Sequence, residues 1–135
     1  MYLVDTNIWL ERLLDQARSE DVHRFLDSTP SEVLFLSDFS FHSIGVVMIR
    51  LDRRDQFLRF VQDLFLEGGV GLVRLLAKDM RRLVQVAEQF RLDFDDAYLC
   101  VAAETHDLTL ISFDSDFDRT ERGRREPMDV LGKRE

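Results

Sequence analysis

The sequence predicts an α/β protein: a three-layer α/β/α sandwich with a central parallel sheet flanked by helices. Short apolar runs alternate along the chain with segments whose apolar residues recur at helical spacing. Such alternation is typical of parallel sheets covered by helices. The chain has 135 residues, of which 45% are hydrophobic. This is enough for one core, so we expect residues 1–135 to form a single domain.

The first half of the chain contains two expected strands, at 2–4 and 33–36. The first is an apolar run that ends abruptly at Asp5. Thr6 or Asn7 can cap the helix that follows, and Ser37 or Asp38 can cap the helix after the second strand. Further helices are expected at 19–26 and 54–66. The second of these should end before Gly68, because paired glycines interrupt a helix.

The second half repeats the pattern with strands at 70–75 and 108–112 and a helix at 78–90. A helix starting at Asp95 or Asp96 should run to about Thr105, directly before the fourth strand. The last apolar run, 128–131, is expected to form a fifth strand. The five strands then account for a complete sheet.

Composition limits the class of protein. The net charge is −8, which counts against a pure nucleic-acid-binding module, since these are usually basic. It counts less against a metal nuclease, whose carboxylates bind cations. The single cysteine, Cys100, cannot form an internal disulfide or a zinc cluster. No apolar run approaches the ~20 residues of a membrane span, and no signal peptide is evident. We therefore expect a soluble, cytoplasmic protein.

Several aspartates follow the expected strands or open the helix between them. Asp5 ends the first strand, Asp114 and Asp116 follow the fourth, and Asp96 opens the helix before it. In parallel sheets, ligands bind at the carboxyl ends of strands. Carboxylate oxygens are suited to Mg²⁺ or Mn²⁺, and without a cation or proton such a cluster would repel itself. The sequence therefore predicts a divalent-metal site built from aspartates.

Three motifs carry a resemblance to the PIN-domain family, which includes VapC-type toxins. The opening motif is Val4-Asp5-Thr6-Asn7-Ile8-Trp9, the later ones are Asp95-Asp96-Ala97-Tyr98-Leu99 and Leu110-Ile111-Ser112-Phe113-Asp114-Ser115-Asp116-Phe117. Asp96 matches a metal-ligand position, and Asp114 and Asp116 match acidic ones. The resemblance covers nearly the whole chain and implies a sheet of order 3-2-1-4-5.

One position departs from the family pattern. PIN domains usually carry a glutamate early in the helix after the second strand, and alignment of the apolar pattern gives that place to Ser43. A serine hydroxyl can orient a water or a phosphate but brings no charge. Asp38 and His42 are the nearby candidates to compensate.

The resemblance implies a metal-dependent endoribonuclease that hydrolyses RNA phosphodiester bonds. Asp5, Asp96, Asp114 and Asp116 would be both the catalytic residues and the ligands of Mg²⁺ or Mn²⁺. The side chains of Thr6, Asn7 and Ser43 would lie next to these ligands and orient them. Apart from the resemblance, an arginine group that includes Arg119 and Arg122 is expected to guide RNA phosphates into the otherwise negative site. The resemblance also implies a toxin role with an antitoxin partner, or a homodimer, through apolar stripes at 9–14 and 57–65.

Two alternatives come from other functional classes. One is a non-catalytic PIN-fold regulator that binds RNA or protein, which the replacement of the glutamate by Ser43 favours. The other is a receiver-like domain, which also gathers aspartates at strand ends. A receiver needs a lysine after a late strand, and neither Lys78 nor Lys133 follows a convincing one.

Overall fold

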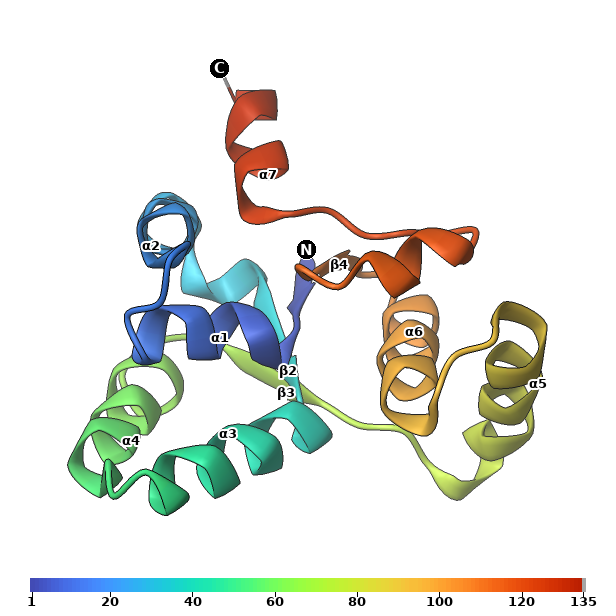
Figure 1. The fold of residues 1–135 in the computed structure, drawn as a ribbon, viewed down its shortest axis with the longest axis horizontal. Coiled ribbons are helices and arrows are strands. Elements are labelled where there is room, and N and C mark those ends of the chain that lie inside the picture. The colour runs from blue at the N-terminus through green and yellow to red at the C-terminus, as the bar shows by residue number, and fades with distance from the viewer. Residues whose placement is uncertain (135) are drawn as a thin grey trace.

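The protein is built on a four-stranded, fully parallel sheet of order β3-β2-β1-β4 (Figure 1). The computed structural model describes residues 1–134. The strands are β1 (Tyr2–Val4), β2 (Leu34–Ser37), β3 (Gly71–Val73) and β4 (Thr109–Ile111). β1 lies between β2 and β4, with Tyr2 opposite both Leu34 and Thr109. The predicted fold class is confirmed, with four strands where five were expected.

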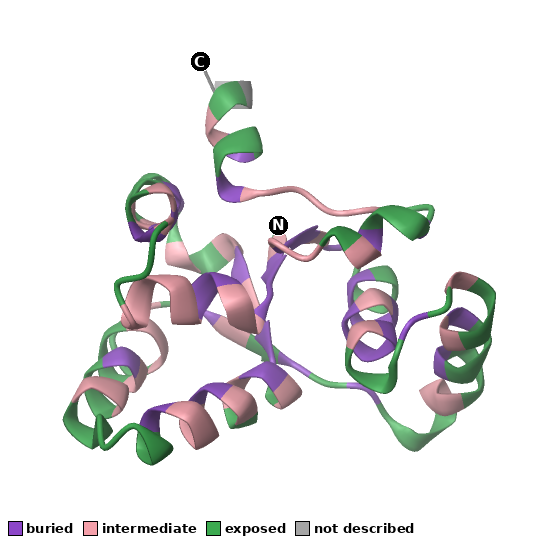
Figure 2. Cartoon of the chain, in the orientation of Figure 1, coloured by how far each residue is buried: buried purple, intermediate pink, exposed green. Residues whose placement is uncertain are grey.

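The sheet separates two hydrophobic cores. Successive side chains of a strand point to opposite faces, so Leu3 joins one core and Val4 the other. The core around Leu3 lies beneath α5 (Met80–Phe90) and α6 (Phe94–His106). The core around Val4 is covered by α1 (Thr6–Leu13), α2 (Ser19–Ser28), α3 (Asp38–Arg50) and α4 (Arg54–Val61). Figure 2 shows the buried strands between these two helical layers.

Helix starts place polar groups at the carboxyl edge of the sheet. Asp5 caps α1, Ser37 caps α3 and Asp93 caps α6, each through a side-chain oxygen that accepts from a backbone N–H. All three have the extended backbone that a capping residue needs. The caps expected at Thr6 or Asn7 were wrong, because both residues already have helical positions in α1. Asp95 and Asp96 likewise lie inside α6 and do not start it.

The predicted fifth strand at 128–131 is wrong: these residues belong to α7 (Pro127–Arg134). Proline is favoured in the first turn of a helix, and the Asp129 carboxylate accepts a hydrogen bond from the Glu126 N–H. The fifth sheet position is instead reduced to Arg125, which forms a single parallel bridge with Ile111. Ser112 N–H donates to the Arg125 carbonyl at 3.0 Å, and Arg125 N–H donates to the Leu110 carbonyl at 2.8 Å.

Residues 113–124 therefore form a loop that leaves β4 and returns to it. The loop contains a short 3₁₀ helix, η4 (Ser115–Arg119). The Phe117 side chain is fully buried in the core under α6. This burial fixes the loop, and with it Asp114 and Asp116, against the sheet.

The remaining elements are short helical turns. α4 continues into a π-helical segment, η2 (Gln62–Leu66), where one regular helix was expected. The 3₁₀ turns η1 (Ser31–Val33) and η3 (Ala77–Asp79) precede β2 and α5.

The Trp9 ring is buried and meets the Phe60 ring edge-on at 5.5 Å, so these members of the two apolar stripes pack against each other. Within the described residues, no helix is long and apolar enough to cross a membrane.

Candidate metal centre

Asp5 lies at the carboxyl end of β1 and is a buried residue, 7% exposed. Thr6 N–H donates to Oδ1 and the Ser112 hydroxyl donates to Oδ2, both at 2.7 Å. Burial disfavours the charged form and raises the pKa of Asp5 to about 6, although these two hydrogen bonds work in the opposite direction. The fold has therefore supplied hydrogen-bond donors for a carboxylate that it has also desolvated.

Ser112, which the sequence analysis missed, connects the residues around Asp5. Its fully buried hydroxyl accepts from Asp114 N–H at 3.0 Å and from the Asn7 side-chain amide at 3.3 Å. The Asn7 side-chain oxygen accepts from Phe113 N–H. The available signal was a serine directly after an apolar strand and two residues before Asp114. A buried hydroxyl needs partners, and the carboxyl end of β4 provides them.

Asp96 approaches from the other side, on the first turn of α6. No described residue donates a hydrogen bond to its carboxylate; its backbone N–H is bound by the Asp93 cap. Burial, followed by the charges of Asp93, Asp114 and Asp5, raises the pKa of Asp96 to about 7. Near neutral pH this carboxylate is therefore poised between its charged and neutral forms, and a nearby cation would favour the charged one.

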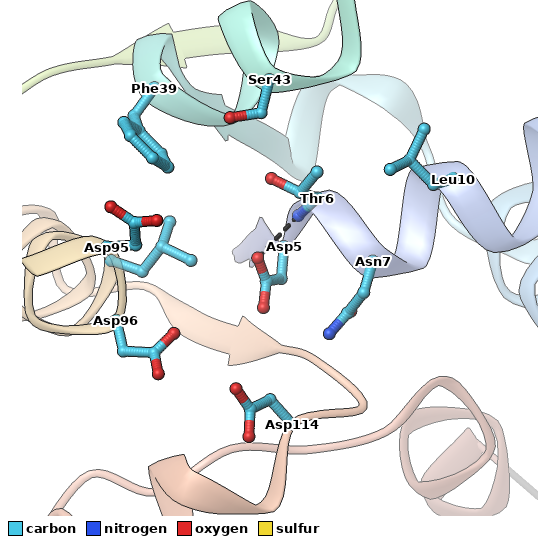
Figure 3. Close-up of a pocket in the computed structure, with 10 residues that line it drawn as sticks. Asp5, Thr6, Asn7, Leu10, Phe39, Ser43, Asp95, Asp96 and Asp114 are labelled. Atoms are coloured by element: carbon cyan, nitrogen blue, oxygen red, sulfur yellow. Dashed lines mark hydrogen bonds between the residues drawn. The ribbon is translucent and has the colours of Figure 1, made fainter. Parts of the chain in front are cut away.

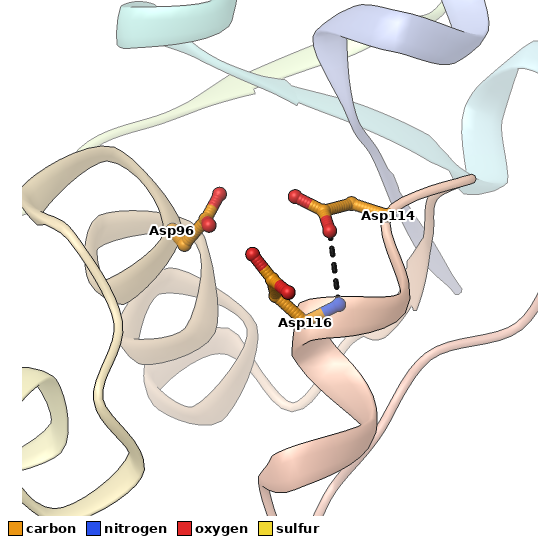
Figure 4. A group of neighbouring side chains, drawn as sticks. All are labelled: Asp96, Asp114 and Asp116. Atoms are coloured by element: carbon orange, nitrogen blue, oxygen red, sulfur yellow. Dashed lines mark hydrogen bonds between the residues drawn. The ribbon is translucent and has the colours of Figure 1, made fainter.

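Asp114 and Asp116 complete the cluster from the loop after β4. One carboxylate oxygen from each of Asp96, Asp114 and Asp116 lies within 4.8 Å of the other two. Figure 4 shows the three side chains together. The Asp114 Oδ1 accepts from Asp116 N–H at 2.9 Å. This Asx-type hydrogen bond turns the chain so that both side chains face α6.

A pocket of about 290 Å³ lies between these elements (Figure 3). Asp5, Asp96 and Asp114 line it, as do Thr6 and Asn7. The remaining wall is made of Leu10, Phe39, Ser43, Asp95 and Leu99. Three of the four predicted acidic residues thus share one pocket, and Asp116 joins two of them at its edge.

Ser43, which occupies the place of the glutamate usual in PIN domains, lines this pocket. Neither candidate to compensate for the missing charge does so. The Asp38 carboxylate accepts a hydrogen bond from the Tyr98 hydroxyl at 2.8 Å, and neither Asp38 nor His42 lines the pocket. The α3 wall therefore presents a hydroxyl and an aromatic ring.

The two arginines predicted to contact RNA lie in different places. The Arg119 guanidinium contacts the Asp116 carboxylate at 3.2 Å, beside the cluster. The Arg122 guanidinium contacts Asp107 and the Leu108 carbonyl. These residues precede β4, at the end of the strand opposite Asp114, so the structure does not bring Arg122 to the pocket.

The chain's family follows from a direct comparison. The PIN domain family model matches residues 2–123. The chain belongs to the PIN domain family. This match excludes the receiver-like alternative. A search of curated proteins gave no match.

Solved structures with the same fold include a toxin–antitoxin complex and a toxin. A toxin–antitoxin complex from Klebsiella pneumoniae is 23% identical, with a TM-score of 0.73, covering 94% of this chain and 98% of that one. FitAB bound to a DNA fragment is 21% identical, with a TM-score of 0.78, and the match covers 94% of this chain and 95% of that one. Mycobacterium tuberculosis VapC20, described as a sarcin–ricin loop cleaving toxin, is 18% identical, with a TM-score of 0.73. This match covers 87% of this chain and 93% of that one. At these identities the likeness establishes the fold alone.

The donor set of this PIN domain suits a hard divalent cation. All the clustered groups are carboxylates, which Mg²⁺ and Mn²⁺ prefer. Asp96 has no hydrogen-bond donor of its own among the described residues, and the oxygens of three carboxylates are close enough to share one ion. We therefore regard the cluster as chemically fit for such an ion.

Proposed function

We propose that this protein is a divalent-metal-dependent endoribonuclease of the PIN type that hydrolyses RNA phosphodiester bonds. The observation that carries the proposal is the convergence of Asp5, Asp96 and Asp114 on one pocket of a PIN fold, with Asp116 beside them. Mg²⁺ or Mn²⁺ is the proposed cofactor. When bound, such an ion activates water and stabilises charge on phosphate oxygens.

The residues around the pocket then have distinct roles. Asp96, Asp114 and Asp116 would hold the ion, and Asp5 would bind it directly or through water. Ser112 and Thr6 keep the Asp5 carboxylate in one orientation, and Asn7 in turn orients Ser112. Such supporting hydrogen bonds preserve the geometry of a metal site. No serine or cysteine nucleophile is needed, because water attacks the phosphorus.

Arg119 is the proposed contact to an RNA phosphate near the site. Its guanidinium is half-exposed and touches Asp116, so it can turn toward a phosphate without losing a buried partner. A positive charge here also offsets the surrounding carboxylates for an approaching polyanion. Single-stranded or loop RNA suits the open pocket, because its backbone is accessible.

The proposed biological role is that of a toxin controlled by an antitoxin. This extension is supported by neighbours of the same fold that are toxins or toxin–antitoxin complexes. Co-expression with the protein encoded beside it would test the role, because an antitoxin should restore growth of cells that express the wild-type chain. An Asp96→Asn chain should be harmless without any partner.

Cleavage of a mixed single-stranded RNA pool tests the activity directly. We expect cleavage by the wild type with Mn²⁺ or Mg²⁺, none with EDTA, and at least about a hundredfold loss in Asp96→Asn, since removing a supporting group alone costs up to that much. Asp55→Asn, an exposed carboxylate on α4, is the matched control and should keep wild-type activity. Equal rates in the wild type and Asp96→Asn would reject the proposal.

A second candidate function, a non-catalytic regulator on the PIN fold, is favoured by Ser43 at the pocket wall. The two candidate functions predict different results for the Ser43→Glu variant. Ser43→Gln is its uncharged control. In a nuclease, the added carboxylate should tighten Mn²⁺ binding in calorimetry and preserve or raise cleavage. In a regulator, Mn²⁺ binding should tighten without any cleavage appearing.

A further inference from the structure

We propose that Phe94 is a stacking platform for one nucleobase of a single-stranded nucleic acid, next to the metal pocket. The inference rests on the proposed nuclease function and assigns a base-binding subsite to it. Among the aromatic side chains, all of which lie in the described part of the chain, Phe94 alone is exposed, at 54%. Ten other phenylalanines are buried or half-buried.

The local structure of α6 gives no reason for an exposed phenylalanine. Phe94 is the first residue of α6, directly after the Asp93 cap. The apolar contact that often fixes a helix start involves the residue before the cap and the fourth helical residue, which here are Leu92 and Ala97. Phe94 takes no part in that contact, and its ring lies outside both hydrophobic cores.

A row of three rings connects Phe94 to the pocket. The Phe94 and Tyr98 ring centroids are 6.1 Å apart, and those of Tyr98 and Phe39 are 5.9 Å apart. Phe39 lines the acidic pocket, opposite Asp95 in Figure 3. Tyr98 is buried and held by hydrogen bonds to Asp38 and from Leu75 N–H. The exposed ring therefore has a rigid support, and it lies two residues from Asp96.

An unpaired arginine lies next to this row. Arg74 immediately precedes Leu75, and among the described residues it forms no ion pair, only a long 3.5 Å contact to the Leu75 carbonyl. The neighbouring Leu75 N–H donates to the Tyr98 hydroxyl, which places Arg74 one residue from the row. An exposed ring beside an unpaired arginine matches how proteins bind single strands, by stacking bases while cations follow the phosphates.

The occupant we infer is a nucleotide adjacent to the phosphate held in the pocket. Its base would stack on the free face of Phe94, and its own phosphate would contact Arg74. Every nucleobase has a π-face, so this subsite would favour unpaired bases without selecting one of the four. Duplex RNA, whose bases are stacked on each other, would be excluded from it.

The experiment compares two ligands of equal length and charge: a single-stranded RNA decamer and an abasic sugar–phosphate decamer. Fluorescence anisotropy in Ca²⁺ measures their affinities, with a gel to verify that the RNA stays intact. Phe94→Ala should weaken RNA binding by about fivefold to 150-fold, the range that base–aromatic stacking supplies, and leave the abasic ligand unaffected. Arg74→Ala should weaken both ligands alike.

Control variants separate stacking from other causes. Phe94→Trp should retain RNA binding, whereas Phe94→Leu, apolar but without a π-face, should behave like Phe94→Ala. Leu58→Ala, an exposed apolar residue on α4, should change nothing. Wild-type binding without preference for RNA over the abasic ligand, no binding of either, or full binding by Phe94→Leu would each overturn the stacking site. These measurements do not involve cleavage, so they fail independently of the nuclease test.

Discussion

The two sides of the acidic pocket treat their carboxylates differently. On the strand side, Asp5 receives hydrogen bonds from Thr6 N–H and the Ser112 hydroxyl. On the helix side, no described residue donates to Asp96, and the neighbouring aspartates repel it. Both pKa values are raised by burial, but only on the strand side does the protein itself offset part of the cost. The strand side is thus preformed by the fold, whereas the charge of the helix side is left for a proton or a cation to neutralise.

Among substitutions that leave the four aspartates in place, disrupting the hydrogen bonds of the strand side should have the largest effect on cleavage. Ser112→Ala removes the donor to Asp5 and the acceptor of Asp114 N–H and Asn7 in one step. We expect cleavage to fall by about tenfold to a hundredfold, as for other supporting residues of metal sites. Ser112→Thr keeps the hydroxyl and is the matched control. Unchanged kcat in Ser112→Ala, measured at saturating Mn²⁺, would mean that this network does not orient the site.

Neutralising Asp5 should stabilise the metal-free protein while removing cleavage. The folded-state pKa of about 6 exceeds the ordinary value of 3.8, so the folded form binds a proton more tightly than the unfolded chain. This contribution to stability is complete below about pH 4 and is lost as the pH rises through 6. At pH 8 the wild type has lost it, and Asp5→Asn is expected to be more stable by roughly 1–2 kcal/mol.

Urea denaturation in EDTA at pH 8 and at pH 4 measures this effect. The advantage of Asp5→Asn should be much smaller at pH 4, where Asp5 is protonated in the folded protein and about half protonated in the unfolded chain. Asp55→Asn serves as the exposed-carboxylate control. An Asp5→Asn protein that is less stable than the wild type at pH 8 would contradict the prediction.

The smallest expected effect concerns pH and cation on the helix side. The pKa of Asp96 is raised to about 7, so protons and a cation compete for it. Mg²⁺ stabilises the folded state according to its binding affinity, and this increase in Tm should be a few degrees at pH 8 and nearly absent at pH 5.5. Thermal unfolding with and without Mg²⁺ at both pH values is the test. Asp96→Asn should show little Mg²⁺ response at either pH; a full response would place the ion elsewhere.

The acidic residues on both sides of the pocket were expected from the sequence, whereas the serine that supports Asp5 was not. Asp5 could be identified because an ionisable group at the end of a buried strand needs a partner. Asp114 and Asp116 followed from the same argument for β4. Ser112 was missed because a single serine carries no periodic or charge signal, and its importance depends on the three partners that the fold brings to it.

Errors in the fold have similar physical causes. Residues 128–131 have the composition of a strand, but Pro127 and the Asp129 interaction with Glu126 N–H start a helix there. Arg122 was grouped with Arg119 by proximity in sequence, yet the loop carries it to the amino end of β4. Local patterns predict which elements form, whereas the path of an irregular loop depends on long-range contacts.

The loop at 113–124 has a consequence for how this site can vary. Its two ends are fastened to neighbouring points of β4, and Phe117 anchors it in the core under α6. In the closeness of its ends it resembles an Ω-loop. Lengthening such a loop costs little closure entropy, about 0.6 kcal/mol for each doubling, and leaves the sheet pairing intact. Related proteins could therefore lengthen the part of this loop that follows Asp116, and thereby change which substrates reach the pocket, while Asp5, Asp114, Asp116 and the sheet remain unchanged.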